Sequence, residues 1–188
     1  MTDGAAADTG HRVLQTWLGE EVETLADLLR PGLSGAVVGI NPSPVSVAAG
    51  HYYQGRVGQT FFRRLERAGL LAPGDGFEDD RAFAAGIGFT DVVKRPTARA
   101  HDLRPEELAH GKQALEAKLL ELEIPRILFT FKASAVALLG KFGGHGLRPG
   151  TPLGKAEVFV MPGPMEASEK VNLAMGSLRE WWAGRVEP

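Results

Sequence analysis

Short apolar runs alternate with helical patterns along most of this chain. Runs rich in β-branched or aromatic residues predict strands at 36–40, 86–93, 127–131 and 157–161. Apolar residues at helical spacing predict helices at 61–68, 105–123, 133–142 and 171–181. Strands that alternate with helices favour a parallel sheet covered on both faces. The predicted fold class is α/β: a three-layer α/β/α sandwich with a central, mainly parallel four-stranded sheet.

The segment before the first strand also carries a helical pattern. Apolar residues recur between His11 and Leu29 at helical spacing, with an interruption near Gly19 and an end at Pro31-Gly32. We therefore expect a helix here. Residues 1–10 are small and polar, without the apolar core of a signal peptide or a membrane span, so we expect a disordered tip. Residues 11–188 are expected to form a single domain.

Composition narrows the function classes. The chain has 188 residues, a net charge of −2 and a pI near 6.2, so it lacks the overall basic character of a strong nucleic-acid binder. Any contact with DNA would be made by a local patch. With no cysteine, the chain cannot form disulfides or hold cysteine-ligated zinc or iron–sulfur clusters. We expect a cytoplasmic, monomeric protein with no membrane partner.

Candidate chemistry gathers where the predicted strands end. Asn41 follows Gly39-Ile40 and precedes Pro42, and Asp91 follows Thr90 at the end of the second strand. In open α/β sheets, ligands bind at the carboxyl ends of parallel strands. Asn41 and Asp91 could therefore face one small ligand if their strands are adjacent, since neighbouring strands lie about 4.8 Å apart. The simpler alternative is that Asn41 caps the backbone after a strand.

Four motifs carry a family resemblance. They are Gly39-Ile40-Asn41-Pro42, preceded by 25–33; Gly50-His51-Tyr52-Tyr53-Gln54-Gly55, followed by Phe61-Phe62; the segment 89–97; and Met161-Pro162-Gly163-Pro164. Their order resembles that of the mismatch-specific uracil-DNA and thymine-DNA glycosylases, within the uracil-DNA glycosylase superfamily. The resemblance covers roughly residues 22 to 183.

The resemblance implies a DNA repair enzyme that flips uracil out of mismatched DNA, chiefly opposite guanine. Thymine and damaged pyrimidines are further candidate substrates. Hydrolysis of the N-glycosidic bond would leave an abasic site without a metal or an organic cofactor. The expected partner is double-stranded DNA with a G:U or related mismatch, and activity on single-stranded DNA stays open. Two rivals also stay open: a lesion-binding or single-strand-binding module that has lost the chemistry, and a nucleoside hydrolase.

The resemblance also suggests roles for pocket residues. Asn41 would position the attacking water. Asp91 departs from the family pattern, and its carboxylate could act as a general base or stabilise positive charge on the sugar. It could instead cap a turn or pair with Lys94 or Arg95. Tyr53 would stack on the flipped base. Further residues that would bind the base are Gly39, Ile40, Tyr52 and Ser46, while His51 is either an entrance residue or a local hydrogen-bonding group.

A loop and several cations would contact the DNA. In the family, the loop after the fourth strand enters the duplex, and here it comprises Gly163, Pro164, Met165, Glu166, Ala167 and Ser168. Met165 is the only large apolar side chain in it that could act as a wedge. Gly163 and the acidic Glu166 depart from the family pattern, and a plain loop with Ser168 as helix cap is the alternative. Candidate phosphate contacts are Lys132, Lys94, Arg95 and Arg99.

Overall fold

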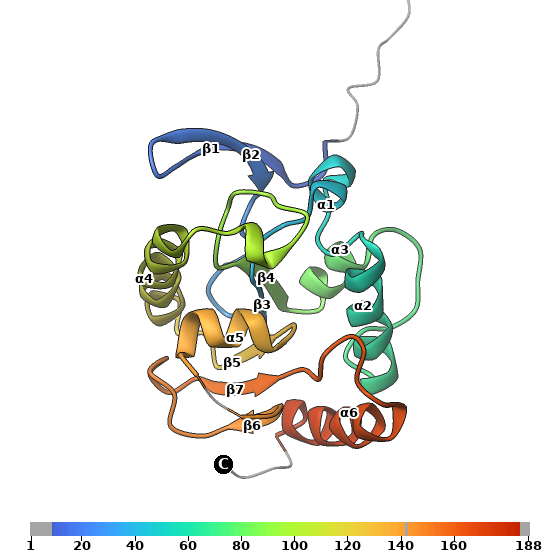
Figure 1. Ribbon diagram of the computed structural model, residues 1–188. Helices are drawn as coiled ribbons and strands as arrows, with labels where there is room; N and C mark the ends of the chain where they lie inside the picture. Colours follow the sequence, from blue (N-terminus) through green and yellow to red (C-terminus); the bar gives the residue numbers. More distant parts are fainter. Residues whose placement is uncertain (1–8, 142, 185–188) are drawn as a thin grey trace, which may run out of the picture.

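A computed structural model describes residues 9–141 and 143–184 (Figure 1). The central sheet has the strand order β4-β3-β5-β7-β6. Its strands are β3 (Gly35–Gly39), β4 (Ile87–Asp91), β5 (Arg126–Phe129), β6 (Gly146–Arg148) and β7 (Glu157–Val160). The first four in this order are parallel and match the four predicted strands. The prediction of four strands is corrected to five, because the short, glycine-flanked β6 adds an antiparallel edge.

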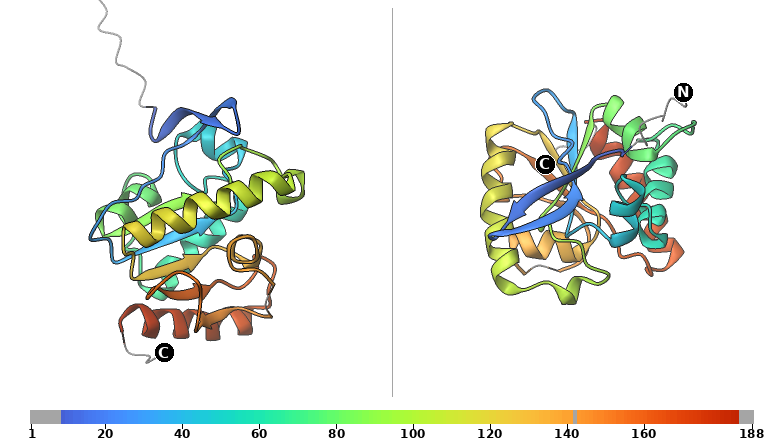
Figure 2. Two further views of the ribbon diagram at one scale, coloured as in Figure 1. Left: turned by 90° about the vertical axis from the view of Figure 1, so that its left-hand side faces the viewer. Right: turned by 90° about the horizontal axis from the view of Figure 1, so that it is seen from above.

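Alternate residues of each strand face two separate cores. Val37, Leu128 and Phe159 pack against one group of helices, whereas their neighbours Val38, Phe129 and Val160 pack against the other. The first group is α1 (Pro44–Ala49), α2 (Arg56–Ala68), α3 (Glu78–Ala84) and α6 (Ser168–Trp182). The second is α4 (Pro105–Glu121) and α5 (Lys132–Leu139). The predicted three-layer α/β/α arrangement is therefore confirmed, as seen from above in Figure 2.

The predicted helix over 11–29 is wrong. This segment is an antiparallel hairpin of β1 (Arg12–Trp17) and β2 (Glu20–Leu25), which lies at the top of the view in Figure 1. Leu18 and Gly19 have φ values of 50° and 84°, and two consecutive positive values specify a tight type I′ hairpin turn rather than a helix. Trp17 then inserts between the hairpin and α4, where its ring lies edge-on to His110.

Two short helices are absent from the predicted elements. α1 begins at Pro44, and the Ser43 side chain accepts a hydrogen bond from Ser46 N, as in a standard N-cap. α3 follows the long connection after α2. Most of the predicted N-terminal tip, residues 1–8, lies outside the described residues, as does residue 142 of the predicted helix over 133–142. Within the described ranges, no helix combines the length and apolar character needed to span a bilayer.

Candidate active site

Parallel strands bring the predicted site residues to one edge of the sheet. β3 and β4 are direct neighbours, and their register pairs Gly39 with Asp91. The strands that carry Asn41 and Asp91 are therefore adjacent, as they must be if both residues are to face one ligand. β5 and β7 end at the same edge, so the segments that follow them, which begin at Thr130 and Met161, lie there too.

A cleft of about 550 Å³ opens at this edge. Gly39, Ile40, Asn41, Ser46 and Tyr53 of the predicted site all line it. The sequence interpretation assigned no individual role to several other lining residues, among them Arg56, Phe61, Thr97 and Thr130. A volume of this size is typical of a pocket for one small-molecule ligand.

The Asn41 side chain is held in one orientation. Its Nδ2 donates to Arg95 O at 3.2 Å, to Pro42 O at 3.1 Å and to Thr97 Oγ1 at 2.9 Å. Two of these partners are carbonyl oxygens, which can only accept, so the atom facing them must be the amide nitrogen. Thr97 Oγ1 donates its own proton to Arg99 O at 2.9 Å, so it accepts the hydrogen bond from Asn41. No described residue donates to Asn41 Oδ1, which is therefore available to accept from a water or a ligand.

The Asp91 carboxylate lies against the bare face of Gly39. A methyl group added at Gly39 would stand 2.0 Å from Asp91 Oδ1 and 2.8 Å from the Tyr53 hydroxyl, so both oxygens converge on this glycine. Both are buried, and neither has a hydrogen-bond partner among the described residues. Asp91 itself is only 2% exposed and is not one of the residues that line the cleft. It sits directly behind Gly39, which does line it.

Burial raises the pKa of Asp91 to about 7. Lys94, whose ammonium donates to the Asp91 backbone carbonyl at 2.8 Å, opposes this shift, and the carboxylate of Asp27 adds to it. A carboxyl group with a pKa near neutrality can both accept and release a proton at working pH. A buried, unpartnered carboxylate next to a cleft is a candidate for catalysis on physical grounds.

Tyr53 presents its ring to the cleft from a strained backbone. Its φ is 58°, which is uncommon for a residue with a side chain, and α2 packs so closely that Gly58 could not carry a methyl group without touching Tyr53 O. The ring lies edge-on to Phe61 and Phe89. Tyr52, also predicted to bind the base, points into the core instead, where its hydroxyl donates to Ala26 O at 3.0 Å.

A comparison with protein families shows which superfamily this domain belongs to. The family model of the uracil DNA glycosylase superfamily matches residues 27–182. This chain belongs to that superfamily. Membership implies a glycosylase type of activity on DNA, and the fold described above is consistent with it.

The superfamily domain carries its predicted DNA-entering loop between β7 and α6. Met165 is 94% exposed, as a wedge would require. Arg64 of α2 is buried and donates to Pro162 O at 2.6 Å and to Gly163 O at 2.9 Å. It thereby holds the start of the loop, a role that the sequence did not reveal. Ser168 is the first residue of α6 rather than its cap, which is Ala167.

The cations predicted to contact phosphate differ in whether they are already paired with a carboxylate of the protein. Lys94 is nearly buried in an ion pair with Asp27, and Arg95 makes two 2.7 Å contacts with the carboxylate of Glu107. Both cations are thus engaged in ion pairs within the protein, although the Arg95 side chain is still 28% exposed. Lys132 starts α5 at the cleft edge of the sheet. Arg99 is exposed and lines the cleft, where its guanidinium pairs with Asp102 at 3.3 Å. Arg56, which the sequence interpretation did not name, is also exposed and lines the cleft.

Proposed function

We propose that this protein is a mismatch-specific uracil-DNA glycosylase that acts on uracil opposite guanine. The observation that carries the proposal is the fixed Asn41 amide at the floor of a cleft that also contains Tyr53. Flipping a base out of a mismatch requires less free energy than flipping it out of a normal pair, which favours mismatched substrates. Thymine and damaged pyrimidines are secondary candidates.

In this proposal, the flipped base stacks on Tyr53 and the attacking water is held by Asn41 Oδ1. Asn41 orients the water but does not remove a proton from it, because an amide oxygen is too weak a base. Asp91 Oδ1 is unpartnered and lies against Gly39, which lines the cleft, and in this proposal it is the proton acceptor. The uracil leaves as an anion when the bond to the sugar breaks.

Single-turnover excision from a labelled duplex with one G:U pair tests the proposal. Asn41→Ala should lower the rate by about 10²-fold or more, and Asp91→Asn by about 10²–10⁴-fold. Asn172→Ala and Asp75→Asn, which change the same residue types away from the cleft, should leave it unchanged. Parallel substrates with A:U pairs and single-stranded uracil would measure the preference for the mismatch.

Other outcomes select the rivals. A folded protein that binds uracil-containing DNA but releases no uracil would be a lesion-binding module. Activity on free deoxyuridine without activity on DNA would identify a nucleoside hydrolase. Full excision by Asp91→Asn, with Asn41→Ala inactive, would remove Asp91 from the chemical step while leaving the glycosylase assignment intact.

A further inference from the structure

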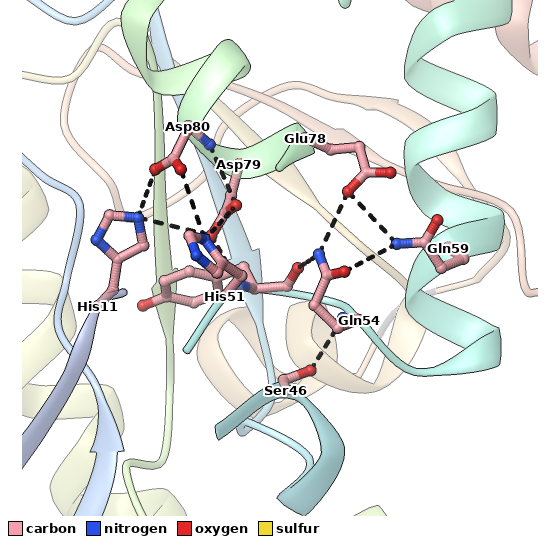
Figure 3. A network of polar contacts seen from close by, with 9 residues as sticks. His11, Ser46, His51, Gln54, Gln59, Glu78, Asp79 and Asp80 are labelled. Atoms are coloured by element: carbon pink, nitrogen blue, oxygen red, sulfur yellow. Dashed lines mark hydrogen bonds and ion pairs between the residues drawn. The ribbon is translucent and has the colours of Figure 1, made fainter. Parts of the chain in front are cut away.

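Two histidines and two aspartates from three distant segments converge on one point beside the domain core. They are His11 at the start of the hairpin, His51 between α1 and α2, and Asp79 and Asp80 in α3 (Figure 3). Each offers one donor atom, and all four atoms lie within 4.8 Å of one another. No short-spacing motif links these residues, which is why the sequence indicated no metal.

The donor atoms have the separations of ligands around one small cation. His11 Nε2 lies 2.7 Å from Asp80 Oδ1 and 3.9 Å from Asp79 Oδ2, and His51 Nδ1 lies 3.0 Å from Asp79 Oδ1 and 3.7 Å from Asp80 Oδ2. Ligands 2.0–2.1 Å from a tetrahedral zinc ion stand about 3.3 Å apart. The four observed separations involve both oxygens of each aspartate and lie on both sides of this value, so each carboxylate would have to turn one oxygen toward the ion and the four donor atoms would have to draw together from within 4.8 Å.

The cluster is built into the fold rather than spread over the surface. The side chain of Asp79 is completely buried and that of His51 is 4% exposed. Asp79 Oδ2 accepts a 2.8 Å hydrogen bond from Tyr52 N, and the His51 ring stacks on Phe77 at 3.5 Å. Supporting contacts of this kind orient the ligands of metal sites. His11 and Asp80 close the outer side and remain partly exposed, so an ion could enter there.

We propose that this cluster binds one divalent transition-metal ion of the zinc class in a structural site. Imidazole nitrogen together with carboxylate oxygen suits such ions, whereas magnesium and calcium prefer oxygen alone. The ion would connect three segments: the residue before β1, the segment that leads to Tyr53, and α3. On the other side of that segment, Gln54 contacts Glu78 and Ser46, so the ion would help to fix the base-stacking loop (Figure 3).

The competing explanation is a network of two histidine–aspartate pairs that needs no metal. Untagged protein, treated with chelator and then dialysed, distinguishes the two. Calorimetric titration with Zn²⁺ should show one saturable site per chain. The thermal midpoint should rise by about 5–10 °C at a free Zn²⁺ concentration 100-fold above Kd. Co²⁺ should bind at the same site and develop the visible absorption of tetrahedral coordination, and Mg²⁺ should produce no shift.

Variants of the two exposed ligands locate the site without disturbing the core. His11→Gln and Asp80→Asn should each weaken Zn²⁺ binding by about 100-fold or more. His101→Gln is the matched control, because His101 also lies next to an aspartate, at 3.6 Å from Asp102, but in an exposed position. Absence of saturable binding, or equal binding by His11→Gln, Asp80→Asn and the wild type, would overturn the proposal.

Discussion

Replacing Asp91 by Asn should make the stability of the protein less sensitive to pH. Asp91 is 2% exposed and its Oδ1 has no hydrogen-bond partner among the described residues. The folded protein therefore favours the protonated form, and the pKa rises from 3.8 to about 7. In the unfolded chain the carboxyl ionises at its ordinary pKa. Ionisation of Asp91 consequently costs stability as pH rises between these two values, and below pH 4 the penalty is absent.

The size of the effect follows from the pKa difference. At 1.36 kcal/mol per pKa unit, the full penalty above pH 7 is about 4 kcal/mol. Between pH 5 and pH 8 it should grow by about 2.5 kcal/mol. Asparagine cannot ionise, so the variant avoids this loss. The buried amide of the variant lowers its unfolding free energy by about 1–3 kcal/mol, and this loss is the same at every pH.

Urea denaturation of both proteins at several pH values between 5 and 8 measures the difference. Other titrating groups affect both proteins alike, so the difference in unfolding free energy isolates Asp91. Asp75→Asn, at an exposed aspartate, is the control and should leave the pH profile of the wild type unchanged. Parallel pH profiles for the wild type and Asp91→Asn would refute the reasoning, because they would mean that Asp91 ionises normally in the fold.

Three further changes test the site. Arg64→Met should lower the unfolding free energy by about 2–3 kcal/mol in denaturant titrations, because two loop carbonyls lose their donor; the exposed Arg63→Met serves as control. Met165→Ala should slow excision from duplex DNA more than from single strands, and equal slowing would argue against a wedge. Thr97→Val should slow single-turnover excision by about 10-fold, since Asn41 loses one of its three acceptors. An unchanged rate would show that the two backbone carbonyls suffice.

Local sequence patterns were enough to predict the layered fold and much of the cleft. The four parallel strands are short apolar runs bounded by glycine or proline, and such runs have few alternatives to a buried strand. Because parallel strands end at a common edge, the positions of Asn41 and Asp91 in the chain predicted that they are close in space if their strands are adjacent, and β3 and β4 are neighbours. The role of Tyr53 was predicted from the family resemblance of its motif, and Tyr53 lines the cleft.

Long-range packing settled what local patterns could not. Residues 11–29 satisfy a helical spacing, yet the turn at Leu18-Gly19 and the burial of Trp17 against α4 make them a hairpin. Tyr52 and Tyr53 are neighbours in the chain, but a positive φ at Tyr53 sends one ring to the core and the other to the cleft. The pKa of Asp91 and the meeting of His11 with Asp80 depend on groups far apart in sequence, and burial and charge act through space rather than along the chain.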